Sequence, residues 1–153
     1  MKKNKYEASV SIKNRKVSFN FEILDKYTAG MVLRGTEIKS IRMSKATLNE
    51  SFCYIDQGEI FVKNLQINEY SHGTSANHAP TRVRKLLLSK KEISKIDNAL
   101  KDKSLTIVVR SLWLSKKGWA KLDIAVAKGK KNHDKRESLK KKDAQRELSR
   151  KEY

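Results

Sequence analysis

The residues best suited to chemistry form a basic cluster near the middle of the chain. Arg82 and Arg84 are separated by one residue, so an extended segment would place both side chains on one face, next to Lys85. Neighbouring guanidinium groups bind phosphate oxygens well. Asn77 and His78 precede the cluster and add hydrogen-bonding groups, and an imidazole ring can stack on an unstacked base. The pattern favours nucleic-acid binding, and a charged face that is merely solvated is the alternative.

Patterns typical of catalysis or metal binding are weak. The three histidines, His72, His78 and His133, show neither i,i+4 spacing nor a cysteine partner. The carboxylates are scattered, and the sequence has no GxSxG motif and no phosphate-binding glycine loop. We therefore expect no enzyme, no metal and no cofactor. The single cysteine, Cys53, lies in the run SFCYI and is expected to be a buried structural thiol.

The overall charge points to a polyanionic partner. The 153 residues include 35 Lys or Arg against 17 Asp or Glu, a formal net charge of +18. A field of this sign favours RNA, DNA or a ribosomal surface, and less strongly an anionic membrane. No run of 18 apolar residues occurs, and no apolar signal core follows the charged N-terminus. We expect a cytoplasmic monomer with one compact domain and charged tails.

The last segment, residues 128–153, has a composition of its own. It holds eleven Lys or Arg against five Asp or Glu and few apolar side chains, so it buries too little surface to order by itself. Asp134 and Glu137 have the spacing of an N-cap and a capping-box partner, which predicts a helix after Asp134. We expect a tail that is disordered when free and helical when bound. A generic cationic extension that gains affinity through counterion release is the alternative.

The part before the tail is predicted to be mainly β. Residues 1–16 are expected to form a basic, mobile arm, and residues 17–127 a folded domain. Alternation at Phe19, Phe21 and Ile23 predicts the first strand, with a bulge or bend at Gly30. A short helix is predicted with Thr36 as its cap. Two hairpins follow from runs of β-forming residues: 52–55 with 60–65, and 105–114 with 119–127.

The remaining elements complete a small barrel. Residues 68–85 lose periodicity and contain the only proline, which predicts a long loop. Ser89 and Glu92 have capping-box spacing and predict a second helix. The sequence has about six extended segments, two short helices and no βαβ rhythm. A closed or partly open antiparallel barrel fits best, because closure removes exposed strand edges. Lys121 on the last strand and Asn14-Arg15-Lys16 would extend one basic surface.

Three motifs give the chain a resemblance to a known family. GTEIKSIR at Gly35–Arg42, NHAPTRVRKLLL at Asn77–Leu88 and AKGKKNHDKR at Ala127–Arg136 stand in the order and approximate spacing typical of the SsrA-binding protein (SmpB) family. NRK at Asn14–Lys16 also fits, and the resemblance covers nearly the whole chain. It implies an oligonucleotide-binding (OB) type β-barrel with two or three short peripheral helices.

The resemblance also implies a function. Members of this family bind the tRNA-like domain of transfer-messenger RNA (tmRNA, or SsrA RNA). They deliver it, with elongation factor Tu and GTP, to stalled ribosomes for trans-translation, while alanyl-tRNA synthetase charges the RNA. By this resemblance the chain is an RNA-binding factor and not a catalyst. A structural RNA-binding protein of the small ribosomal subunit is the alternative.

The same resemblance assigns site residues. Family positions linked to RNA binding fall at Asn14, Leu87 and Lys121, whereas Thr28 stands where relatives commonly carry an acidic residue. His133 would lie near the decoding centre, with the tail helix following the empty message channel. The full predicted tmRNA-binding set is Asn14, Arg15, Lys16, Glu37, Lys39, Asn77, His78, Arg82, Arg84, Lys85, Leu87 and Lys121. The predicted ribosome-binding set is Lys128, Gly129, Lys130, Lys131, His133, Asp134, Lys135, Arg136, Lys140 and Arg146.

Overall fold

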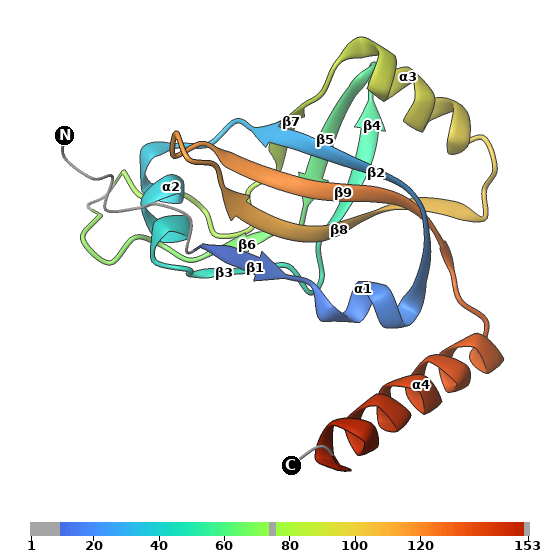
Figure 1. Cartoon of the computed structure of the whole chain (residues 1–153). Coiled ribbons are helices and arrows are strands. Elements are labelled where there is room, and N and C mark those ends of the chain that lie inside the picture. Colours follow the sequence, from blue (N-terminus) through green and yellow to red (C-terminus); the bar gives the residue numbers. More distant parts are fainter. Residues whose placement is uncertain (1–9, 74–75, 152–153) are drawn as a thin grey trace.

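A ring of antiparallel strands forms the body of the protein (Figure 1). The computed structural model describes residues 10–73 and 76–151. The elements in chain order are β1 Ser11–Lys13, α1 Arg15–Asn20, β2 Phe21–Met31, α2 Gly35–Arg42, β3 Ala46–Thr47, β4 Phe52–Asp56, β5 Glu59–Lys63, β6 Gln66–Ile67, β7 Arg84–Leu87, α3 Lys90–Ala99, β8 Leu105–Leu114, β9 Ala120–Gly129 and α4 Asn132–Lys151.

The main sheet closes on itself. Its strand order is β1-β8-β4-β5-β7-β2-β9, and β8 also pairs with β9. The strands from β8 round to β9 therefore form a closed ring. β1 pairs with β8 at Ser111–Trp113, beyond the Ile107–Val108 segment that pairs with β4. This arrangement confirms the predicted mainly β fold, a small antiparallel barrel with short peripheral helices.

Alternating side chains fill the barrel. On β9, Leu122, Ile124 and Val126 are buried, and Ile107 and Val109 of β8 lie in the same core cluster. The register shifts at Leu24 on β2 and at Arg110 on β8, in both cases against β9. Bulges of this kind increase local twist and help strands to curl into a ring.

The predicted bulge at Gly30 is wrong, because β2 runs through Gly30 without a register shift there. A Cβ atom added to Gly30 would lie 3.4 Å from Leu87 Cβ on the paired strand β7. This is an ordinary van der Waals distance, so the Leu87 side chain simply lies beside the Gly30 backbone.

Both predicted hairpins are confirmed. β4 pairs with β5 in register from Phe52 with Lys63 to Asp56 with Glu59. The turn residues Gln57 and Gly58 have φ values of +49° and +75°, as a two-residue turn matched to strand twist requires. β8 and β9 form the second hairpin.

Helix α3 is confirmed and α2 starts differently from the prediction. At α3 the Glu92 N–H donates to Ser89 Oγ at 3.2 Å, and the Ser89 N–H donates to Glu92 Oε1 at 3.2 Å. At α2 the N-cap position is Arg34, not Thr36, and the Arg34 N–H donates to Glu37 Oε1 at 2.8 Å. Thr36 is free to bond elsewhere because the Glu37 carboxylate caps this helix.

The N-terminal segment differs from the predicted arm. Ser11–Lys13 form β1, and Phe19 lies in α1, so the first strand predicted at Phe19 begins only at Phe21. Residues 1–9 of the predicted arm lie outside the described residues. These elements are too short for sequence periodicity to reveal, and so are β3 and β6, which form a separate two-stranded sheet.

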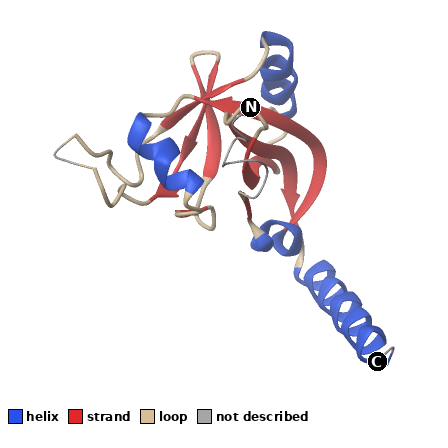
Figure 2. Cartoon of the chain, turned by 60° about the vertical axis from the view of Figure 1, so that its left-hand side comes forward, coloured by secondary structure: helices blue, strands red, loops and turns tan. Residues whose placement is uncertain are grey.

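The tail forms α4, which extends away from the barrel (Figure 2). The helix begins at Asn132, not after Asp134 as predicted. Lys135 is half-buried, and every other α4 side chain that the structure describes is exposed. The described side chains of α4 therefore form no apolar face packed on the barrel, which is the usual source of helix stability in a folded domain.

Candidate nucleic-acid interface

Register aligns residues of five strands in one row on the outer surface of the sheet. Gly30 of β2 pairs with Leu87 of β7 on one side and Lys121 of β9 on the other. Lys121 pairs in turn with Trp113 of β8, which pairs with Ser11 of β1. Paired residues point to the same face of a sheet. Their neighbours Ala29, Leu86, Leu112 and Leu122 are buried, so this first row faces outward.

A second row runs parallel to the first, two residues along each strand. Thr28 pairs with Asp123, which also faces Ser111, and Ser111 pairs with Lys13. Thr28 Oγ1 donates to Asp123 Oδ1 at 2.9 Å, and Ser111 Oγ donates to Asp123 Oδ2 at 2.8 Å. The two hydroxyls hold one carboxylate in a defined orientation on this otherwise basic surface.

The two rows border a hollow and lead to the NRK segment. The hollow has a volume of about 500 Å³ and is lined by Ser11, Lys13, Trp113 and Asp123 among others. The NRK segment follows Lys13 directly, and its Arg15 and Lys16 are exposed. The combined surface is apolar at Leu87 and Trp113, cationic at its lysines, and hollowed next to Trp113.

Asn14 is buried where this surface meets the core. Its Nδ2 donates to the carbonyl oxygens of Leu48 and Val109, at 3.2 and 3.1 Å. Its Oδ1 is buried and has no hydrogen-bond partner among the described residues. Asn14 thus ties α1 to the barrel and retains one unused acceptor.

Glu37 binds two arginines in a buried network between α2 and the segment that leads into β7. Arg84 Nε donates to Glu37 Oε2, and Arg82 Nη2 donates to Oε1 at 2.5 Å. Arg84 is completely buried and also donates to the carbonyl oxygens of Leu65 and Pro80, at 2.6 and 3.1 Å. The predicted phosphate contact through Arg84 is therefore corrected to a structural role, since its donors are used inside the protein. Arg82 keeps 26% of its side chain exposed.

Burial by itself would raise the pKa of the Glu37 carboxyl, but hydrogen bonds from Arg82, the Arg34 N–H and Arg84 outweigh burial and lower it. Burial lowers the pKa of Arg84, from so high a value that the guanidinium remains charged at neutral pH. The buried groups therefore form a charged pair.

Because the pKa of Glu37 is lowered in the folded state, the free energy of unfolding depends on pH. Because the folded state binds the Glu37 proton less tightly than the unfolded state, the stabilisation is complete above the ordinary Glu pKa of 4.5 and is lost as pH falls through the folded value. Urea denaturation should show this loss below pH 4.5, and a carboxyl NMR titration should place Glu37 below 4.5. The control variant Glu59→Gln removes an exposed carboxylate and should lose stability below pH 4.5 just as wild type does. A Glu37 pKa at or above 4.5 would contradict the network.

The loop residues predicted to contact RNA also have internal partners. His78 is buried, with Nδ1 2.8 Å from Thr36 Oγ1 and Nε2 2.9 Å from the Ile67 carbonyl oxygen. Asn77 bonds the backbone of Tyr70 at both its Oδ1 and Nδ2 atoms. His78 is therefore not placed to stack on a base as predicted, because its ring lies inside the protein.

The other two lysines of the predicted set, Lys39 and Lys85, also lie at the surface. Lys39 Nζ lies 5.4 Å from the centre of the Tyr70 ring. Lys85 Nζ lies 3.0 Å from Glu59 Oε1, and both side chains are largely exposed. Surface pairs of this kind hold their cations weakly and leave them accessible.

The basic residues of the tail lie along the end of β9 and along α4. Lys128, Gly129 and Lys131 are exposed, and Lys130 Nζ donates to the Ser18 carbonyl oxygen at 3.0 Å. Lys140 and Arg146 are exposed on the helix, as is Arg136. The side chains of His133 and Asp134 lie outside the described residues. The tail also reaches the second row, because Lys142 of α4 lines a cavity of about 510 Å³ together with Lys13, Ser111 and Asp123.

Comparison with known proteins identifies the family. The model of the family described as SmpB protein matches residues 11–152. An SsrA-binding protein of Bacteroides thetaiotaomicron is 53% identical over 144 residues, which cover 94% of this chain and 96% of the relative. The chain belongs to the SmpB family. An SsrA-binding protein of Bacillus pumilus is 48% identical over 146 residues, covering 95% and 93% of the two chains.

A solved structure gives the same family assignment. It is described as "tmRNA-SmpB: a journey to the center of the bacterial ribosome", and its matching chain is 36% identical with a TM-score of 0.69. The match covers 86% of this SmpB-family chain and 95% of the solved chain. The barrel described above is thus the fold of a known ribosome-associated family.

The cysteine and the metal-ligating side chains were also compared with the predictions from the sequence. Cys53 is buried and free, as predicted, and burial raises the pKa of its thiol. The described residues contain no group of three or more His, Cys, Asp or Glu side chains that could hold a metal ion. None of the helices in the described part of the chain combines the length and apolar composition needed to cross a membrane.

The structure divides the predicted RNA-binding set into three parts. Leu87 and Lys121 join in the first row, with Asn14, Arg15 and Lys16 beside the second. Lys39 and Lys85 lie elsewhere at the surface. Glu37, His78, Arg82 and Arg84 instead connect α2 with the loop and β7, and Asn77 bonds within the loop. Sequence reasoning missed Trp113 and Asp123, which complete the rows. The signal for Trp113 was an aromatic residue directly opposite a lysine across the β8–β9 hairpin.

Replacing Lys121 with alanine should weaken RNA binding by about five-fold near 0.15 M salt and lower the salt slope by about one, as expected for a lost phosphate contact. Filter binding with a tmRNA transcript at several salt concentrations measures both quantities. Lys95→Ala removes an exposed lysine from α3, outside the rows, and should change neither. Equal effects of the two variants would show that Lys121 contributes only net charge.

Proposed function

We propose that this SmpB-family protein binds the tRNA-like domain of tmRNA and carries it to stalled ribosomes for trans-translation. The observation that supports this most directly is the first row, where Leu87, Gly30 and Lys121 share one outward strip. The strip combines an apolar contact, close access to backbone and a cation. Phosphate contacts position an RNA while apolar and base contacts read it, and this surface offers both.

The second row and the NRK segment extend the proposed RNA contact. Asp123 is held in place by two hydroxyls, and a carboxylate on a basic surface is suited to base N–H donors instead of phosphate. Arg15 and Lys16, with Lys39, Lys85 and Arg82 farther round the barrel, would add phosphate contacts. In this proposal Glu37, Asn77, His78 and Arg84 act on RNA only through the loop that they position.

The proposed ribosome contact is the tail. We propose residues 128–153 as a separate ribosome-binding segment that is disordered when free and becomes helical in the decoding centre and message channel. Exposure of nearly all described α4 side chains supports this proposal, since such a helix gains stability from a polyanionic partner. Lys128, Gly129, Lys130, Lys131, His133, Asp134, Lys135, Arg136, Lys140 and Arg146 remain the proposed contacts.

The remaining partners follow from the proposed function. Elongation factor Tu with GTP and alanyl-tRNA synthetase act through the bound tmRNA, and the protein works in the cytoplasm as a monomer without catalysing a step. Residues 17–127 form the proposed RNA-binding domain, to which β1 also contributes.

Sequencing the RNA that copurifies with the protein from its own cell tests the proposal. One dominant tRNA-like species is the expected result. A broad spread of RNA would contradict it. Stoichiometric retention in salt-washed small subunits would instead favour a structural ribosomal protein.

A further inference from the structure

The β8–β9 turn presents a tryptophan that neither the rows nor the tail uses. Trp119 is 68% exposed, the highest value among the exposed large hydrophobic side chains. Its backbone is firmly held: its N–H donates to Ser115 Oγ at 3.1 Å, and its carbonyl accepts the Ser115 N–H at 2.8 Å. Gly118, with φ of +85°, donates its N–H to the Ser115 carbonyl at 2.8 Å. The indole is therefore exposed to solvent on a turn that hydrogen bonds hold in place.

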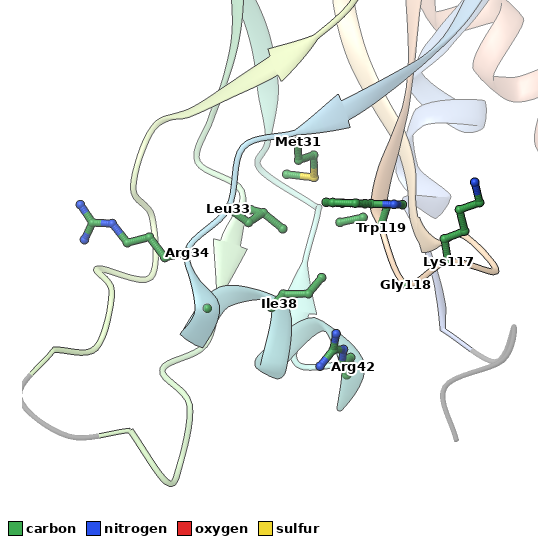
Figure 3. A pocket seen from close by; sticks show the side chains of 10 residues that line it. Met31, Leu33, Arg34, Ile38, Arg42, Lys117, Gly118 and Trp119 are labelled. Atoms are coloured by element: carbon green, nitrogen blue, oxygen red, sulfur yellow. The ribbon is translucent and has the colours of Figure 1, made fainter. Parts of the chain in front are cut away.

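The ring forms one wall of a cavity. Figure 3 shows the Met31, Leu33 and Ile38 side chains directed into the space beside the Trp119 ring. The cavity has a volume of about 320 Å³, within the range of about 300–1,000 Å³ found for small-ligand clefts. One aromatic wall facing apolar side chains suits a flat apolar group.

The rim of the cavity is cationic. Arg34, Arg42 and Lys117 line it, and the lining residues include no carboxylate. Arg34 and Lys117 point outward on opposite sides in Figure 3. A Cβ atom added to Gly118 would lie 4.0 Å from Arg42 Nη2, so that guanidinium lies beside the turn. A flat group that also carries negative charge on either side matches this arrangement of an aromatic wall and a cationic rim.

The cavity lies one residue beyond the first row along β2 and β9. Met31 follows Gly30 on β2, and Ala120 precedes Lys121 on β9. Ala120 is buried and Met31 packs against the core cluster, so the cavity lies on the inner side of the strand segments that carry the first row.

We propose that this cavity, the Trp119 pocket, binds one unstacked nucleobase of the RNA, with the base against the indole and the flanking phosphates near Lys117 and Arg42. The proposal rests on the proposed RNA-binding function and names a recognition element within it. Base–aromatic stacking tolerates any base and contributes substantially to binding of unpaired segments. The pocket therefore reads strand shape at a loop or bulge.

Filter binding of a tRNA-like domain transcript to the full chain tests the pocket. Trp119→Ala should weaken binding about ten-fold, within the range for one stacked base, whereas Trp119→Phe should stay within about three-fold of wild type. Leu24→Ala is the control: it removes another exposed apolar side chain, 48% exposed and outside the pocket, and should leave affinity unchanged. Thermal unfolding checks that each variant is folded.

Indole fluorescence gives an independent readout. A saturating concentration of the transcript should quench the indole fluorescence of wild type more strongly than that of Trp119→Phe. The difference in quenching reports stacking on Trp119. If wild type binds the transcript and Trp119→Ala binds equally, the pocket proposal is wrong while the proposed function stands. If Trp119→Ala keeps RNA affinity but loses tagging on ribosomes, the pocket takes a protein or ribosomal surface and the nucleobase proposal is also wrong. If wild type itself binds no tmRNA, the proposed function fails.

Discussion

Replacing Arg84 with alanine is expected to lower the free energy of unfolding by about 3–5 kcal/mol, because Glu37 would remain as a buried charge without its main partner. The same change removes donors to the Leu65 and Pro80 carbonyl oxygens. Domains are typically stable by only about 5–15 kcal/mol, so the variant would lose a large part of its stability and unfold at a lower urea concentration. Urea denaturation followed by circular dichroism measures the loss.

Arg82→Ala is the matched control, since Arg82 binds the same carboxylate but is partly exposed. Its loss leaves the Arg84 pair intact and should cost about 1 kcal/mol. Arg84→Lys should recover only part of the stability, because an ammonium cannot reproduce the arginine fork. If Arg84→Ala lowers the free energy of unfolding no more than Arg82→Ala does, the network does not hold the loop to α2.

Local chemistry explains which elements the sequence could predict. The β4–β5 hairpin follows from Gly58 between two β-forming runs, and α3 follows from the Ser89 and Glu92 capping box. In both cases the decisive residues lie within a few positions of one another. The β1 strand exists because β8 offers it an edge at Ser111–Trp113, and three residues carry no periodicity that reveals such a partner.

The functional surface was harder to predict because its residues meet through register. The spacing of Arg82 and Arg84 correctly placed both arginines near one group, but that group is Glu37, 45 and 47 residues away. A fully buried arginine and an exposed one look the same in sequence. Leu87 was named through resemblance alone and Lys121 through its place on the last strand as well, whereas Trp113 and Asp123 needed the β8–β9 pairing to be known. Trp119 did carry a local signal, an aromatic residue among Lys116, Lys117 and Lys121.

Truncation after Lys131 is expected to leave tmRNA affinity within about three-fold of wild type and to abolish peptide tagging on stalled ribosomes. The barrel, both rows and the Trp119 pocket lie before the cut, and α4 buries little against them. Filter binding measures the first quantity, and a reconstituted translation reaction on a truncated message measures the second. Loss of tmRNA binding together with unchanged tagging per bound complex would reverse this division of labour.

A helix-breaking variant separates a positioned tail from a merely cationic one. Ala144→Pro keeps every charge of the tail but costs about 3 kcal/mol of helix stability at the centre of α4. If the tail acts as a helix in a channel lined by ribosomal RNA, Ala144→Pro should lose most tagging, whereas the matched variant Ala144→Ser should retain it. If counterion release alone drives the tail's contribution, both variants should tag like wild type, since the number of cations is unchanged. The proline variant thus tests helix formation independently of charge, which truncation cannot do.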